Sequence, residues 1–148
     1  MVRKITSLFF FFSLTTLYAQ PTPVEWYFRI EKSTPANATL VCTAVIQPGW
    51  HIYSQSMSSE GPLPTSFDFE KSPDYLFEGP MIEKNKAYSF YDSLFNMEIK
   101  WLSKVALFAR PLKLLNPQAI IKGKVNYMAC NHETCLPPQQ QEFFIQAH

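Results

Sequence analysis

The amino-acid sequence predicts an all-β protein whose fold class is an immunoglobulin-like antiparallel β-sandwich. Apolar and aromatic residues alternate with polar ones over most of the chain, whereas the period of an amphipathic helix is almost absent. Many short strands with four glycines in all fit a sandwich better than a barrel of tight hairpins. Turn-forming clusters of Pro, Asn, Ser and Gly separate the alternating runs, at 33–37, 47–49, 59–64 and 115–118.

The alternation predicts eight strands. Period-two alternation and runs of β-branched or aromatic residues mark them. In chain order the expected strands cover residues 24–31, 38–46, 50–54, 65–70, 94–102, 105–109, 119–128 and 141–145. The stretch 72–91 mixes Lys, Asn and Glu with Tyr and Phe, and we expect it to be a long loop over one end of the domain.

The amino terminus has the pattern of a secretory signal peptide. Two basic residues precede an uncharged, mostly apolar run at 8–17, and Ala19 offers the small residue that precedes a cleavage site. A membrane anchor is the alternative, but this run is short for a bilayer span. We therefore expect a signal peptide at 1–19 and one mature domain at 20–148, a length typical of a single core.

Charge and hydropathy exclude two kinds of partner. Once the signal peptide is removed, eleven basic residues face twelve acidic ones, a net charge of about −1, and the basic residues are scattered. Nucleic-acid binding is therefore not expected. After residue 19 no apolar stretch is long enough for a membrane span. The mature chain is expected to be periplasmic or secreted, where cysteines can form disulfides.

Two of the three cysteines lie close together near the end of the chain. Cys130 and Cys135 bracket four residues, and a connection of that length lets neighbouring strands turn back and bring the two thiols within bonding range. As a staple the bond closes only a short loop, worth about 2 kcal/mol. Residue chemistry therefore favours a redox-active dithiol, and a secreted protein-binding sandwich with a structural disulfide remains the alternative.

The third cysteine is expected to be a buried free thiol. Cys42 shares one face of its strand with Leu40 and Ala44. An inter-sheet bridge to Cys130 is the alternative, as in antibody domains, but those carry a tyrosine where this chain has Met128.

No metal or other cofactor is expected at the cysteine pair. His132 lies between the two thiols, but a structural zinc ion takes four ligands and a second pair is missing, since His51 and His148 are the only other histidines. The pair does not open a helix either, so neither thiol gains the help of a helix dipole.

Four segments carry a resemblance to a known family. They are PGWHIYSQ at 48–55, GPLPTSFDFE at 61–70, GKVNYMACNHETCLPP at 123–138 and EFFI at 142–145. The chain resembles the amino-terminal periplasmic domain of the DsbD thiol:disulfide interchange reductases over nearly all of the mature domain. One departure is the spacing of the cysteines, because some members have five residues between them where this chain has four.

The resemblance implies a site and a reaction. Cys130 and Cys135 would be the redox pair on a hairpin at one end of the sandwich, and Cys135 would form the mixed disulfide with partners. The aromatic strand beside the dithiol in the family corresponds to His51 and Tyr53, and His132 would neighbour the pair from the hairpin. The dithiol would accept electrons from a membrane-embedded donor of the CcdA or DsbD type, or from thioredoxin-like proteins, and pass them to oxidised periplasmic proteins.

Two features depart from the better-known members of the family. There, a short loop with an aromatic residue caps the dithiol, whereas the matching segment 83–88 has Lys-Asn-Lys, which leaves Tyr88 or Phe90 as substitutes. The reductases also continue into a membrane domain and a thioredoxin-like domain. We therefore expect a free-standing exchange module that is fed by a separate reductase.

Overall fold

The computed structural model describes residues 22–57, 60–92 and 96–147, and the expected signal peptide at 1–19 lies outside them. These residues form twelve strands and no helix, so none of the described elements is a helix that could cross a membrane. The strands are β1 (Val24–Lys32), β2 (Asn37–Ile46), β3 (His51–Tyr53), β4 (Ser66–Phe69), β5 (Tyr75–Phe77), β6 (Ile82–Glu83), β7 (Tyr88–Asp92), β8 (Met97–Leu102), β9 (Val105–Leu114), β10 (Ile120–Tyr127), β11 (Ala129–Cys130) and β12 (Gln139–Gln146).

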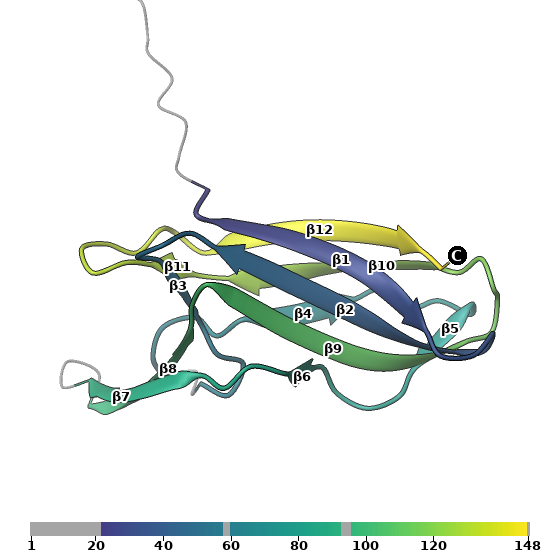
Figure 1. The fold of residues 1–148 in the computed structure, drawn as a ribbon, viewed down its shortest axis with the longest axis horizontal. Coiled ribbons are helices and arrows are strands. Elements are labelled where there is room, and N and C mark those ends of the chain that lie inside the picture. Colours follow the sequence, from purple (N-terminus) through teal and green to yellow (C-terminus); the bar gives the residue numbers. More distant parts are fainter. Residues whose placement is uncertain (1–21, 58–59, 93–95, 148) are drawn as a thin grey trace, which may run out of the picture.

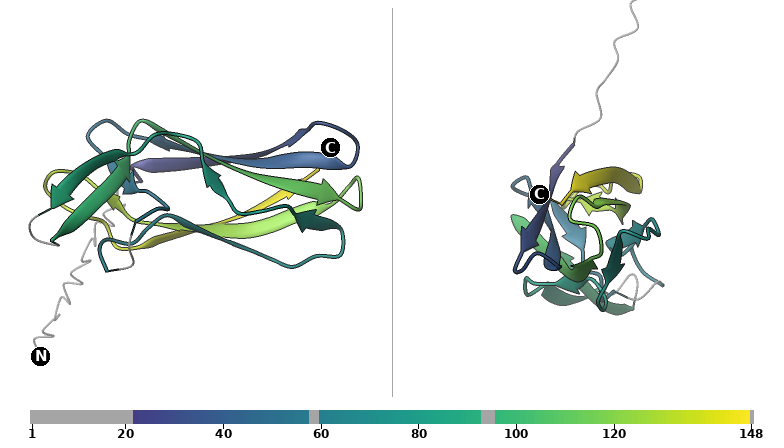
Figure 2. Two further views of the ribbon diagram at one scale, coloured as in Figure 1. Left: turned by 90° about the horizontal axis from the view of Figure 1, so that it is seen from below. Right: turned by 90° about the vertical axis from the view of Figure 1, so that its right-hand side faces the viewer.

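The strands form an elongated sandwich (Figures 1 and 2). One layer has the order β1-β2-β9-β5, with β6 also paired to β9, and the other has the order β12-β10-β4. A third sheet, β11-β3-β8-β7, lies at the end of the sandwich opposite the carboxyl terminus (Figure 1). All the pairings are antiparallel. The predicted immunoglobulin-like antiparallel β-sandwich is therefore confirmed.

The core forms between the two long layers around the ring of Trp26. Its ring lies 5.8 Å, between centroids, from both Phe67 and Phe108, and 5.5 Å from Tyr127, so strands of both layers meet there. Phe108 is fully buried, because alternation on β9 turns every second side chain inward. At the β1 and β12 edge of the sandwich, Phe28 stacks on Phe143 with ring centroids 4.2 Å apart.

The expectation of a long loop at 72–91 is wrong. This stretch contains β5 and β6, which both pair with β9, and β7, which forms a hairpin with β8. These strands have two to five residues, too few for alternation to stand out, and Gly79 at φ +87° with Pro80 interrupts the first two. The strand expected at 105–109 also continues to Leu114, past a charged residue and a proline.

Replacing Phe108 with alanine should lower the free energy of unfolding by about 3–5 kcal/mol, because the change leaves a cavity among the rings of the core. Urea denaturation of the oxidised protein measures the loss. Phe144, on β12, is 80% exposed. The matched variant Phe144→Ala should therefore change stability by less than about 0.5 kcal/mol. Equal losses in the two variants would contradict this description of the core.

Candidate functional site

The two cysteines lie where the β10–β12 hairpin passes from one sheet to another. After Tyr127 the chain leaves its partner strand β12, and β11 pairs instead with β3, in a register that sets Cys130 opposite His51. On its other side Cys130 forms an isolated antiparallel bridge with Cys135. The backbone N–H of Leu136 donates to the carbonyl of Ala129 at 2.9 Å, which holds the returning chain beside β11.

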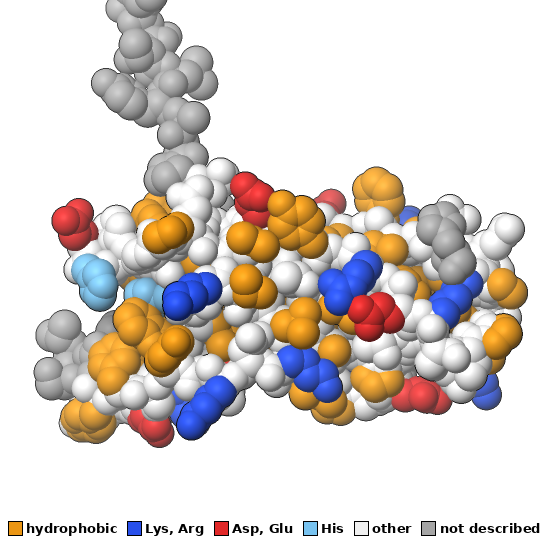
Figure 3. Space-filling view, viewed as in Figure 1, with side chains coloured by type: hydrophobic (Ala, Val, Ile, Leu, Met, Phe, Trp, Pro, Cys, Tyr) orange, Lys and Arg blue, Asp and Glu red, His pale blue; other side chains and the backbone are white. Residues whose placement is uncertain are grey.

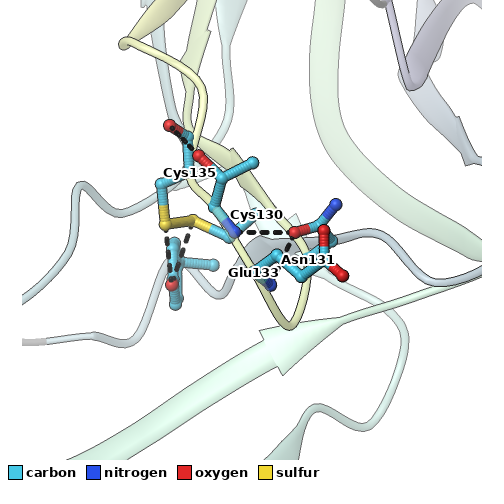
Figure 4. The surroundings of a disulfide bond; sticks show 6 residues. Cys130, Asn131, Glu133 and Cys135 are labelled. Atoms are coloured by element: carbon cyan, nitrogen blue, oxygen red, sulfur yellow. Dashed lines mark hydrogen bonds between the residues drawn. A yellow bond between two sulfur atoms is a disulfide. The ribbon is translucent and has the colours of Figure 1, made fainter.

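An asparagine closes the turn between the cysteines. The side-chain oxygen of Asn131 accepts hydrogen bonds from the backbone N–H groups of Glu133 and Thr134, both at 2.8 Å (Figure 4). The backbone N–H of Asn131 also donates to the carbonyl of Thr134 at 2.9 Å. An asparagine side chain can close a turn in this way without help from other parts of the chain. These bonds hold the hairpin tip in addition to the disulfide.

The predicted disulfide is present between Cys130 and Cys135 (Figure 4), and Cys42 is a free cysteine. The alternative bridge from Cys42 to Cys130 is therefore wrong. Cys42 lies on β2 between Phe28 of β1 and Phe108 of β9, fully buried in the main core. Burial raises the pKa of its thiol to about 12, so the reactive thiolate form of Cys42 is rare at neutral pH.

The two bonded cysteines differ in their access to solvent. Cys130 is only 1% exposed, whereas Cys135 is exposed. Pro137 and Pro138, which follow Cys135, are exposed as well, and Leu136 between them and the cysteine is half-buried. Thiol–disulfide exchange requires a sulfur that the other protein can approach. Of the two cysteines, Cys135 is therefore the more accessible to another protein.

A tyrosine hydroxyl contacts the disulfide from β3. The hydroxyl of Tyr53 donates to the sulfur of Cys130 at 3.2 Å and lies 4.0 Å from the sulfur of Cys135. Its backbone is held by the residue that precedes β4, because the carbonyl of Tyr53 accepts hydrogen bonds from the N–H of Thr65 at 3.2 Å and from the Thr65 hydroxyl at 2.6 Å. A buried hydroxyl fixed in this way can donate to a thiolate when the disulfide opens.

Glu83 fixes the chain that follows Tyr53, a role that the sequence did not indicate. The hydroxyl of the fully buried Ser54 donates to both carboxylate oxygens of Glu83, at 3.0 and 2.9 Å. The backbone N–H of Gln55 donates to the same carboxylate at 3.0 Å. The carboxylate therefore anchors the end of β3 to β6, and this contact spans 29 positions in the sequence.

Tyr88, a candidate for capping the dithiol, lies two strands from Tyr53. Trp101 on β8 pairs in register with Tyr53 on one side and with Tyr88 on the other. At the usual strand spacing the backbones of the two tyrosines are about 10 Å apart. Tyr88 is 59% exposed on β7, and Phe90, 44% exposed, packs on Trp101 at 5.6 Å between ring centroids. Tyr88 and Phe90 therefore lie on β7, and β8 separates them from Tyr53.

A second, smaller hydrophobic cluster surrounds Cys130. Its buried members are Tyr53, Met57, Ile99 and Cys130, and the half-buried residues packed on them are Met97, Trp101 and Met128. Alternation turns the members on β3, β8 and β11 away from the main core, while Ile52, Ala129 and Leu102 of the same strands face it. Figure 3 shows hydrophobic and histidine side chains gathered at this end of the molecule. Cys130 therefore lies in an apolar environment, on the face of the β11-β3-β8-β7 sheet that points away from the main core.

The two histidines near the site differ in burial. His51 is 8% exposed, and its ring packs in a T-shaped arrangement with Trp101, 4.0 Å apart between centroids. Burial, together with the nearby charge of His132, lowers the pKa of His51 to about 4, so its imidazole is neutral at pH 7. His132 is exposed in the hairpin turn. Among the described residues, no group of three or more His, Cys, Asp or Glu side chains is arranged to hold a metal ion.

The sandwich and the hairpin disulfide together define a class: all-β domains that carry a disulfide-bonded cysteine pair at one end. Residues 19–147 match the family described as thiol:disulfide interchange protein DsbD, N-terminal, and the chain belongs to this family. Comparison with curated protein sequences finds no match.

Solved structures share the fold at low sequence identity. The amino-terminal domain of DsbD from Neisseria meningitidis, in its reduced form, is 16% identical with a TM-score of 0.54, over 82% of this chain and 84% of that one. The complex of that domain with the amino-terminal domain of PilB, from the same organism, is 14% identical with a TM-score of 0.54, over 90% of this chain and 94% of that one. The amino-terminal periplasmic domain of ScsB from Proteus mirabilis is 13% identical with a TM-score of 0.56. The match covers 86% of this chain, which spans 47% of the length of that one.

The lowered pKa of His51 predicts a loss of stability in mild acid. Its pKa in the folded protein, about 4, lies below the ordinary value of 6.5, so the unfolded chain takes up the proton first as the pH falls. The free energy of unfolding should therefore decrease between about pH 6.5 and about pH 4, by about 1–2 kcal/mol after allowance for screening by solvent. Urea denaturation at a series of pH values measures the decrease.

Two variants separate His51 from the other groups that titrate in this range. His51→Gln should remove the part of the decrease that comes from the imidazole. His132→Gln should leave a smaller decrease than in the unchanged protein, because the charge of His132 contributes to the low pKa. Parallel pH profiles for the unchanged protein and His51→Gln would contradict the assignment.

Proposed function

We propose that the domain, residues 20–148 after removal of a signal peptide, is an exported thiol–disulfide exchange module. In this proposal the Cys130–Cys135 dithiol accepts electrons from a membrane-embedded or thioredoxin-like reductase in the periplasm and passes them to oxidised proteins. The observation that carries it is the pairing of an exposed Cys135 with a buried Cys130 whose sulfur accepts a hydrogen bond from Tyr53. Family membership supports the reaction class, and the periplasmic ScsB domain and the DsbD–PilB complex support the location and the partner class.

The reduced form would act through two displacements. The thiolate of Cys135 attacks one sulfur of an oxidised partner, a mixed disulfide forms, and the other partner sulfur leaves as a thiolate. The thiolate of Cys130 then attacks the sulfur of Cys135, which re-forms the internal disulfide and releases the second partner thiolate. Two electrons pass to the partner, and the domain becomes oxidised.

Recharging would run through the same atoms in reverse. A thiolate of the electron donor attacks the exposed sulfur of Cys135, and Cys130 leaves as a thiolate. The hydroxyl of Tyr53 is within hydrogen-bonding reach of the Cys130 sulfur and would stabilise its charge in an otherwise apolar cluster. A second thiolate of the donor then attacks the donor sulfur of the mixed disulfide, which releases Cys135 as a thiolate and leaves the donor oxidised. His51, opposite Cys130, would stay neutral and exclude water, while the exposed His132 and Tyr88 would lie on the surface that a partner covers.

Trapping of mixed disulfides tests the roles of the two cysteines. Reduced Cys130→Ser, incubated with an oxidised thioredoxin-like protein, should accumulate a mixed disulfide through Cys135, because no second thiol resolves it. Reduced Cys135→Ser should form about tenfold less, because its remaining thiol is enclosed. Non-reducing electrophoresis and peptide mapping identify the linkage, and the double variant is the control for Cys42. Preferential trapping by Cys130 would reverse the assignment.

A variant without the disulfide should still fold. The hydrogen bonds of Asn131 and of the strand ladder remain in Cys130→Ser/Cys135→Ser. The loop that the disulfide closes is short, so the loss in free energy of unfolding should be about 2 kcal/mol. Urea denaturation compares this variant with the oxidised protein. A variant that is unfolded at room temperature would favour the structural role of the disulfide instead.

A further inference from the structure

The sandwich is open along the edge opposite the Phe28–Phe143 contact. There β4 of one layer faces β5 and β6 of the other without pairing to them. Two adjoining clefts of about 550 and 440 Å³ lie along this opening, and Phe67, Phe69 and Arg110 line both. The opening lies on the long side of the molecule, and neither cleft is lined by either cysteine of the disulfide.

The outer edge of β4 carries backbone groups without partners. The N–H of Glu70 donates to the carbonyl of Lys122. In an antiparallel ladder every second residue bonds to the neighbouring strand, so Asp68 also bonds to β10, whereas Phe67 and Phe69 do not. The N–H and C=O groups of Phe67 and Phe69 therefore point away from β10. The N–H of Thr65 points the same way and donates to the carbonyl of Tyr53. The backbone N–H and C=O groups of Phe67 and Phe69 have no hydrogen-bond partner among the described residues on this side. An edge of this kind is a template for a further strand.

An arginine occupies an inward position beside this edge. Arg110 lies on β9 between the buried Phe108 and Leu112, and it is in register with the buried Leu40. Its guanidinium lies 4.1 Å from the ring centroid of Phe77 and 4.9 Å from that of Phe69, and its Nε donates to the carbonyl of Gly79 at 2.9 Å.

The charge of Arg110 has no counter-ion among the described residues. No described carboxylate lies within ion-pair distance of it, and its two terminal nitrogens have no hydrogen-bond partner there. Burial lowers the pKa of this guanidinium. The planar end of an arginine matches a carboxylate in a bidentate pair.

A second polar group, beside the cleft, lacks a partner. The side-chain oxygen of Gln55, which lines the smaller cleft beside Phe67 and Arg110, is buried and accepts no hydrogen bond from any described residue. Unpaired polar groups in buried places are rare in folded proteins. The cleft thus offers donors for a carboxylate and an open strand edge, and the buried oxygen of Gln55 lies behind its lining.

We propose that the β4 edge binds an extended peptide segment of a partner protein by strand addition, with an acidic side chain of the peptide paired to Arg110. The added strand would hydrogen-bond to the backbone of Phe67 and Phe69. Its inward side chains would alternate with outward ones, so apolar side chains would cover the aromatic rings while one carboxylate reaches the guanidinium. This binding uses neither Cys130 nor Cys135, so it goes beyond the exchange reaction.

The probe is a fluorescein-labelled peptide with the sequence Thr-Val-Thr-Glu-Thr-Val-Thr between flanking serines, which sets Val, Glu and Val on one face. We expect fluorescence anisotropy to show binding by the purified domain. Amide hydrogen exchange at Phe67 and Phe69 should slow when the peptide is present. A peptide that is N-methylated at alternate residues should not bind, because it cannot form the ladder. A peptide with Gln in place of Glu should bind about tenfold more weakly.

Protein variants complete the test. Arg110→Met should bind the Glu and Gln peptides equally, and Arg110→Lys should restore only part of the preference. The Cys130→Ser/Cys135→Ser variant should bind as the unchanged protein does, so failure here and failure of the exchange reaction are seen separately. The inference is overturned if the Glu peptide does not bind at up to about 1 mM, the range of very weak complexes. It is also overturned if the N-methylated peptide binds equally, or if Arg110→Met keeps the tenfold preference.

Discussion

The pairing of β11 with β3 determines the chemistry at this end of the molecule. It sets Cys130 opposite His51, and the hydroxyl of Tyr53, two residues further along β3, then reaches the Cys130 sulfur. The same register sends Ala129 and Ile52 into the main core. Because side chains alternate along a strand, a slip of one residue would exchange these faces and bury Cys130 in the main core, away from Cys135. Of the two residues of β11, Ala129 thus faces the main core and Cys130 faces the disulfide.

The site and the open edge of β4 share a structural residue. Thr65 binds the carbonyl of Tyr53 with both its N–H and its hydroxyl, and β4 begins at the next residue. Glu83 holds the other side of the same region through Ser54 and Gln55. The position of Tyr53 therefore depends on Thr65 and Glu83, which are distant from both cysteines in the sequence. Substitutions at Thr65 or Glu83 would act on the dithiol only through the backbone of β3.

Local patterns predicted the parts of the structure that local physics determines. Alternation located β1 and β2 within one residue at each end, and the four-residue spacing predicted the Cys130–Cys135 bond. The resemblance pointed to His51 and Tyr53, which do lie beside Cys130. Contacts between distant segments could not be predicted in this way, since neither Glu83 on Ser54 nor the short strands β5 to β7 leave a local pattern. Arg110 misled the assignment of β9, because a charge at an inward position looks like the end of a strand.

The central claim is that the hairpin disulfide is redox-active and not structural, and its reduction potential tests this most directly. The oxidised domain is equilibrated with a series of glutathione or dithiothreitol redox buffers, and the fraction of free Cys130 and Cys135 is measured by alkylation and mass spectrometry. A redox-active pair should have a midpoint between about −180 and −270 mV, the range of thioredoxin-like exchange proteins. A midpoint below about −300 mV, where structural disulfides of secreted proteins lie, would contradict this claim.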